Sequence, residues 1–152
     1  MKTEQTIDVL NTLVTINNDR IEGYETASNE TEEQDLKSIF ARFAQTSHAC
    51  RQALAHEVTR LGGTPSEGTR TSGKIFRVWM DVKAAVTGKD RKGILNSCEY
   101  GEDMAVDTYD TVLKENQDDI TSEQQTMLLD QRELIKADHD EVKAMRDVLA
   151  NA

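Results

Sequence analysis

Apolar residues recur at three- and four-residue spacing along most of the chain, and this feature restricts the fold more than any other. The spacing continues over stretches of about 25 to 30 residues, which suit helices and are too long for strands. It is interrupted at residues 61–73, where the only proline, Pro65, and four of the eight glycines gather. The pattern therefore predicts long helices with one polar loop between the second and the third.

The expected helices cover residues 3–27, 32–61, 90–116 and 122–149, with a shorter helix over 74–87. Gly62 is expected to end the second long helix in a left-handed conformation. Thr121 is expected to cap the last helix, because Gln124 three residues later completes a capping box. Trp79 is expected to anchor the short helix on the others.

The lengths of the connections predict the topology. The first and second long helices, and likewise the third and fourth, are joined by a few residues and should form antiparallel hairpins. The link between the second and third is about 28 residues long, enough to cross the whole bundle. We therefore predict an all-α, ferritin-like four-helix bundle of up-down-down-up order, with a long crossover that carries the short extra helix, as one domain of residues 1–152.

Composition narrows the range of partners. The chain has 28 acidic and 18 basic side chains and a net charge of -10, which argues against a nucleic-acid surface and against docking to anionic lipid. We see no signal-peptide core and no apolar stretch near the roughly 20 residues of a membrane span. Cys50 and Cys98 are too few for a disulfide framework and are expected to be reduced, buried thiols. These features predict a cytoplasmic protein.

Some polar residues fall on the apolar stripes. Helical phasing at about 100° per residue turns five of them inward. They are Asn17, Tyr24, Glu102, Gln131 and Asp138. We expect a buried, hydrogen-bonded polar layer in which Glu102 is satisfied by Asn17, Gln131, Tyr24 or Tyr109 and fixes the helix register.

The same phasing places four other acidic residues less centrally. Glu57 lies on a stripe, Glu25 toward the edge of one, Glu99 on a shoulder, and Glu22 largely outside. Nearly all the remaining acidic side chains are expected to face solvent.

A metal site is the alternative interpretation of these inward carboxylates. Di-iron and di-manganese bundles carry two Glu-x-x-His pairs, but here Gln45 precedes His48 and Lys136 precedes His139 at the required spacing. A standard di-iron site is therefore not predicted. A single-ion or degenerate iron or manganese site remains open, with ligands Glu25, Glu99, Glu102 and His139.

Five separated strings carry a resemblance to a known family. They are INNDRIEGYETA (16–27), LGGTP (61–65), VWMDVKAAVTGKD (78–90), CEYGEDMAVDTY (98–109) and HDEVKAMRD (139–147). Over about residues 6–147 the chain resembles an uncharacterised bacterial family of four-helix-bundle proteins, a domain of unknown function within the ferritin-like superfamily. The resemblance implies a ferritin-like fold and a bacterial cytoplasmic origin, and it implies no activity. The family's recurrent polar positions correspond to Asn17, Glu22, Tyr24, Glu99, Glu102 and His139. Glu22 is the position where resemblance and helical phasing disagree.

Two functional hypotheses follow from these observations. The leading one is a non-enzymatic structural, interaction or stress-related protein that has a buried polar layer, needs no cofactor and associates with itself, as a dimer. The alternative is a divergent metal-binding ferritin-like protein or oxidoreductase that uses Glu25, Glu99, Glu102 and His139.

Overall fold

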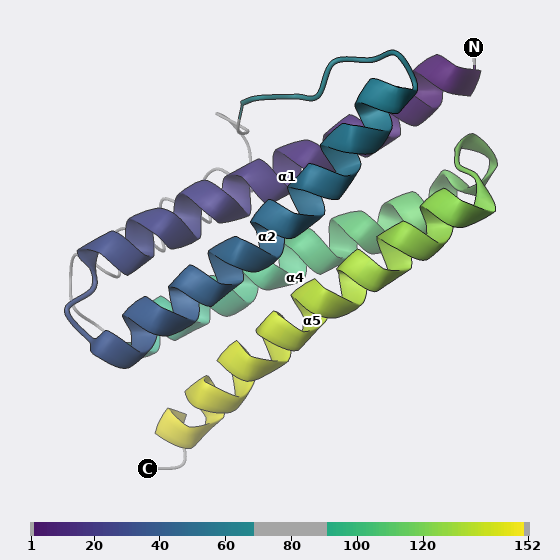
Figure 1. The fold of residues 1–152 in the computed structure, drawn as a ribbon. Helices are drawn as coiled ribbons and strands as arrows, with labels where there is room; N and C mark the ends of the chain where they lie inside the picture. The colour runs from purple at the N-terminus through teal and green to yellow at the C-terminus, as the bar shows by residue number, and fades with distance from the viewer. Residues whose placement is uncertain (1, 69–90, 151–152) are drawn as a thin grey trace.

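The chain folds into an all-α four-helix bundle (Figure 1). The computed structural model describes residues 2–68 and 91–150, and within these ranges all regular structure is helical. The elements are α1 (Lys2–Glu30), α2 (Gln34–Arg60), α4 (Arg91–Glu115), the short 3-10 helix η1 (Gln117–Asp119) and α5 (Ser122–Ala150). The predicted helix over 74–87 and its anchor Trp79 lie outside the described residues.

The helices follow the predicted up-down-down-up order. Helix α1 packs along α2, and α4 packs along α5, as two hairpins. Helices α2 and α4 run in the same direction, from lower left to upper right in Figure 1. Contacts at both ends agree with this order, because Arg91 at the start of α4 binds Glu33 and Asp35 at the start of α2. At the opposite end, the Thr6 hydroxyl near the start of α1 donates to the carbonyl of Asp119 in η1.

Two helix termini have the predicted local geometry. Gly62 has φ +89°, and the amides of Gly62 and Gly63 bond the carbonyls of Thr59 and Val58, which is a Schellman ending for α2. At the start of α5, the Thr121 amide donates to Gln124 Oε1 while the Gln124 amide donates to Thr121 Oγ1. The capping box is thus confirmed.

Helix α1 is longer than predicted. The polar turn was expected to begin after Ala27, but the helix continues to Glu30. Ser28 supports this extra turn by a hydrogen bond from its hydroxyl to the Lys37 carbonyl, and its own carbonyl accepts from Lys37 Nζ at 2.9 Å. Tertiary contacts with α2 therefore override the weak helix preference of these polar residues.

The core consists of two apolar clusters, one toward each end of the bundle. One cluster includes Leu10, Leu13, Leu54 and Val112. The other contains Phe40, Phe43, Leu95 and Val142, among other side chains. On α1, α2 and α4, buried polar residues lie between the two clusters in sequence, around residues 17–20, 47 and 102. On α5, Gln131 lies within the range of the first cluster, between Leu128 and Ile135.

No helix in the described part of the chain combines the length and apolar character that crossing a membrane requires.

Candidate functional site

Arg20 of α1 is the centre of a buried ionic network. Its side chain is 1% exposed and that of Glu102 is 0% exposed. Arg20 Nε and Nη2 donate to the two oxygens of the Glu102 carboxylate, each at 2.8 Å. This two-pronged geometry is the strongest that an arginine and a carboxylate form.

The same guanidinium reaches the remaining two helices. Nη1 donates to the Ser47 hydroxyl on α2, and Nη2 donates to Asp138 Oδ2 on α5 at 3.2 Å. Since Glu102 belongs to α4, one side chain of α1 contacts all three other helices of the bundle. We call Arg20, Ser47, Glu102 and Asp138, together with Tyr24, the charged layer.

Tyr24 completes the charged layer from the apolar side. Its hydroxyl donates to Glu102 Oε1 at 2.7 Å. Its ring packs against Phe40 and Phe43 of α2 with centroid distances of 5.6 and 5.2 Å, and the Arg20 guanidinium lies 5.3 Å from the ring centre. The aromatic cluster therefore holds the hydroxyl where the carboxylate needs a third donor.

Burial and pairing act in opposite directions on the acids of this layer. Burial raises the pKa of Glu102 above its ordinary value, and Arg20 and the Tyr24 hydroxyl oppose the rise. Burial likewise raises the pKa of Asp138 against the pull of Arg20. Burial lowers the pKa of Arg20, but the carboxylates of Glu102 and Asp138 outweigh it, so the pKa is raised and the guanidinium stays charged.

A second network, without formal charge, also joins the four helices. Asn17 Nδ2 of α1 donates to the Tyr109 hydroxyl of α4, which donates to Gln131 Oε1 of α5. Gln131 Nε2 donates to the Cys50 carbonyl of α2 at 3.3 Å. One acceptor, Asn17 Oδ1, is buried and accepts no hydrogen bond from the described residues. We call Asn17, Tyr109 and Gln131 the neutral layer.

Both cysteines lie beside these layers as free, buried thiols. Burial raises the pKa of Cys50 to about 11. Burial and the Glu102 charge raise the pKa of Cys98 still further from its ordinary value. Both thiols are therefore protonated at neutral pH and are poor nucleophiles.

The polar residues of α5 repeat every seven positions. Asp138 joins the charged layer and Gln131 the neutral layer. Gln124 then donates to Glu57 of α2 at 2.7 Å, and Glu57 is also bound by Arg60. A seven-residue repeat returns to the same helix face, so this polar stripe follows the inner side of α5.

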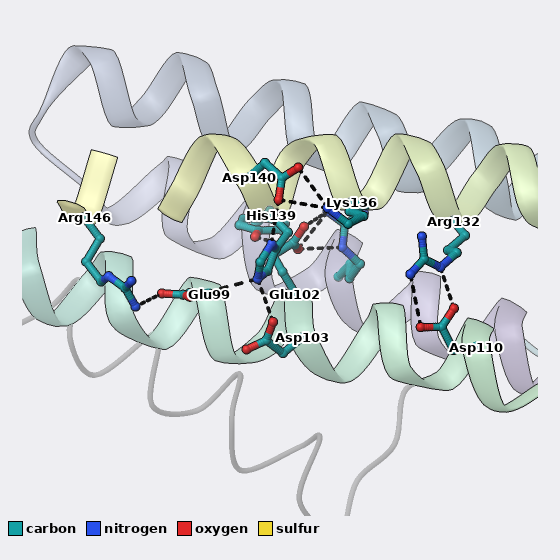
Figure 2. Close-up of polar contacts among 11 residues, drawn as sticks. Glu99, Glu102, Asp103, Asp110, Arg132, Lys136, His139, Asp140 and Arg146 are labelled. Atoms are coloured by element: carbon teal, nitrogen blue, oxygen red, sulfur yellow. Dashed lines mark hydrogen bonds and ion pairs between the residues drawn. The ribbon is translucent and has the colours of Figure 1, made fainter. Parts of the chain in front are cut away.

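A separate polar cluster lies on the outer side of α4 and α5 (Figure 2). The imidazole of His139 on α5 points toward Glu99 and Asp103, which lie one turn apart on α4. Its Nε2 is 2.6 Å from Asp103 Oδ1 and 4.0 Å from Glu99 Oε1. Arg146 binds the other oxygen of Glu99, and Asp140 lies beside His139 Nδ1.

The structure places all five residues of the predicted polar layer in the two layers. Asn17 and Gln131 belong to the neutral layer, and Tyr24, Glu102 and Asp138 to the charged layer. Of the four partners expected for Glu102, Tyr24 donates to its carboxylate, whereas Asn17, Tyr109 and Gln131 form the neutral layer. Its main partner, Arg20, was missed. The signal was present, because Arg20 follows Asn17 by three residues and precedes Tyr24 by four.

The four alternative metal ligands are not brought together. The Glu25 side chain is 55% exposed and faces His48 on the α1–α2 surface, at 3.4 Å. Glu102 is turned into the core and bound by Arg20. Glu99 and His139 do meet, and the carboxylate that joins them is Asp103, which phasing did not single out.

Two further acidic positions refine the predicted burial. Glu22 is exposed, as helical phasing predicts. Asp19 is only 4% exposed, although helical phasing places it on the side of α1 away from Asn17, so its inclusion among the solvent-facing acids was wrong.

A four-helix bundle built around a buried arginine–carboxylate network is the class that the fold and the site define. Within this class, the chain belongs to the family described as Domain of unknown function (DUF2383), which matches residues 5–115. The prediction of a family of unknown function is therefore confirmed. A comparison with curated proteins found no match. The matched range ends with α4 and includes Arg20, Ser47 and Glu102, whereas Asp138 and His139 on α5 lie beyond it.

Proposed function

We propose that the protein is a non-enzymatic helical bundle that acts as a structural or interaction module, and that its charged layer fixes how the four helices align. The contact of Arg20 with one residue on each of the other helices carries this proposal. An ion pair that is fully buried contributes little net stability, but it penalises every arrangement that leaves one charge without its partner.

The state of the inward polar groups supports a structural role. The Glu102 carboxylate already accepts three hydrogen bonds from Arg20 and Tyr24. Three hollows on the described surface are lined by other residues, and none of the three includes Arg20, Tyr24 or Glu102. A substrate that bound the Glu102 carboxylate would have to displace Arg20 or Tyr24 from it. A carboxylate that is enclosed and fully hydrogen-bonded in this way suits a structural role.

The order of the helices supports a relationship to ferritin-like bundles. These bundles have one long crossover connection, and here the chain between α2 and α4 connects two parallel helices. The metal chemistry of such bundles is not part of the proposal, because Arg20 occupies the carboxylate that would serve it.

Self-association as a dimer is also part of the proposal. Among the large apolar side chains that are exposed in the described residues, Leu129, Leu134 and Val148 all lie on α5. Sedimentation velocity over a hundredfold range of concentration tests this part. A dimer is expected, and a lone 17.1 kDa species at every concentration would remove it.

The alignment role is tested by replacing the charged layer with apolar residues. In the variant R20M/E102M/D138L, the free energy of unfolding should stay equal to wild type or rise by about 1 to 4 kcal/mol. Its amide NMR spectrum should nevertheless lose the single set of sharp peaks expected of wild type, or its oligomeric state should change. A variant with one sharp set of peaks and the wild-type oligomeric state would show that the charged layer does not fix the alignment.

The rival, a ferritin-like metal centre, is tested by elemental analysis of protein purified without chelator. The proposal expects no iron or manganese that depends on Glu102. Stoichiometric iron or manganese that disappears in E102Q would replace the structural role by a metal-dependent one.

A further inference from the structure

The cluster around His139 differs from the buried layers because two carboxylates and an imidazole converge near the surface around one buried ring nitrogen. Glu99, Asp103 and His139 each offer one ligand atom, and these three atoms lie within 4.8 Å of one another. His139 Nε2 is buried and makes no hydrogen bond of good geometry with the part of the chain that the structure describes, although Asp103 Oδ1 is only 2.6 Å away. A nitrogen in this position faces carboxylate oxygens without a well-directed proton between them.

The other ring nitrogen of His139 explains why Nε2 is left facing the carboxylates. Nδ1 lies 3.1 Å from Asp140 Oδ1, so this carboxylate accepts the proton in the tautomer that carries it on Nδ1. The neutral imidazole then presents its Nε2 lone pair toward Glu99 and Asp103. Metal-bound histidines usually have this arrangement, in which a carboxylate holds the far N–H and directs the near nitrogen at the ion.

We propose that Glu99, Asp103 and His139 bind one divalent first-row transition-metal ion between α4 and α5. Asp140 would direct the imidazole, and Arg146 would hold the second oxygen of Glu99. One imidazole nitrogen and two carboxylate oxygens suit Zn²⁺, Mn²⁺ or Fe²⁺, and positions not filled by the protein are taken by water.

The distances allow such an ion after small side-chain movements. Ligands at about 2.0 to 2.2 Å from one tetrahedral ion are about 3.4 Å from each other. The Nε2–Asp103 distance of 2.6 Å must therefore lengthen, and the Nε2–Glu99 distance of 4.0 Å must shorten. The Asp103 side chain is 52% exposed and can move away from Nε2. Glu99 and His139 are 14% and 16% exposed, and a rotation of the Glu99 carboxylate would bring its oxygen closer to Nε2.

The charges nearby also permit a cation. Glu99, Asp103 and Asp140 bring three negative charges, and Arg146 and Lys136 bring two positive charges to the same surface. A divalent ion shared by these groups would cross-link α4 and α5 apart from the core contact of Asp138 with Arg20. The cross-link goes beyond the proposed structural role and does not use the charged layer.

A metal titration of the full chain tests this site. Protein treated with EDTA and then dialysed is titrated with Zn²⁺ and Mn²⁺ by calorimetry, and its thermal unfolding is followed with each ion. We expect one ion per chain and a rise in Tm that grows with ion concentration. Substitution of either H139Q or D103N should weaken binding at least tenfold and remove the rise in Tm.

The chain supplies a matched control in a second histidine–carboxylate pair. His48 lies 3.4 Å from Glu25 on the α1–α2 surface, and no third ligand joins them within residues 2–68 and 91–150. H48Q should therefore bind the ion as wild type does, and so should E102Q, because Glu102 faces the core. Circular dichroism of each variant shows that loss of binding is not loss of fold.

Three results would overturn the proposal. One is absence of saturable binding in wild type, and another is equal binding in wild type and H139Q. The third is a cluster stabilised by a proton alone, in which Tm responds to pH between 5 and 7.5 in wild type and not in H139Q, with no response to either ion. None of these results affects the structural role, which is tested separately by the apolar replacement of the charged layer and by the search for iron or manganese that depends on Glu102.

Discussion

The charged and neutral layers make the same connections by different chemistry. Each joins α1, α2, α4 and α5 near the middle of the bundle, and on α4 and α5 their members are seven residues apart, at Glu102 and Tyr109 and at Asp138 and Gln131. The charged layer holds formal charges at almost no exposure, so loss of one partner leaves a buried ion. The neutral layer tolerates an unpaired acceptor, Asn17 Oδ1. Under the proposed function, misalignment of the helices is therefore costly in the charged layer and less costly in the neutral layer.

The largest effect is expected from R20M. Of the donors that the described residues give to the buried Glu102 carboxylate, it leaves the Tyr24 hydroxyl, and it should lower the free energy of unfolding by about 3 to 5 kcal/mol. Urea unfolding at pH 7 measures this change. R132M is the matched control, because Arg132 pairs with Asp110 on the surface of α4 and α5 and should cost less than about 1 kcal/mol. Equal losses in the two variants would contradict the distinct role of the buried arginine.

A smaller loss is expected from Y109F in the neutral layer. The variant removes one donated and one accepted hydrogen bond and leaves Asn17 and Gln131 partly unsatisfied, at a cost of about 1 to 3 kcal/mol. The same urea measurement applies. Y100F, at an exposed tyrosine, should change little. If Y109F cost more than R20M, the neutral layer would be the one that enforces alignment.

The free energy of unfolding should depend on pH through the charged layer and not through the neutral layer, and this effect is the next in size. The folded pKa of Glu102 is raised above the ordinary value of 4.5, so the folded state binds this proton more tightly than the unfolded state does. Its contribution to stability is present below pH 4.5 and is lost as pH rises through the folded pKa, at no more than about 1.4 kcal/mol per pH unit. E102Q should remove this decline, whereas Y109F should shift the whole curve without changing its slope. An unchanged slope in E102Q would refute the assignment.

The smallest effect is expected at Glu57, and it has the opposite sign. The hydrogen bond from Arg60, supported by Gln124, lowers the pKa of Glu57 to about 2. Its contribution is therefore present above pH 4.5 and is lost as pH falls toward 2. Because Arg60 is exposed, the difference between wild type and E57Q at pH 6 should be below about 1 kcal/mol and should vanish near pH 2. A difference that grows in acid would contradict this sign.

The sequence predicts the helices and their order because these depend on local spacing and on connection length. It also predicts which residues turn inward where the apolar arc is wide, as for Asn17, Tyr24 and Gln131. It could not assign partners, because the bond from Arg20 to Glu102 depends on how two helices 82 residues apart are rotated. Asp103 was missed for the same reason, since a residue on the outer side of α4 gains meaning only from its neighbour on α5.

The buried charges of the two hairpins are complementary. The α1–α2 hairpin contributes the cation, and the α4–α5 hairpin contributes both anions, Glu102 and Asp138. A hairpin paired with a second copy of itself would bring like charges together in its core. Pairing of two identical hairpins should therefore be less favourable than pairing of the α1–α2 hairpin with the α4–α5 hairpin. A chain cut between residues 68 and 91 should therefore yield two fragments that reassemble as one of each. The buried charges thus favour the association of the two different hairpins.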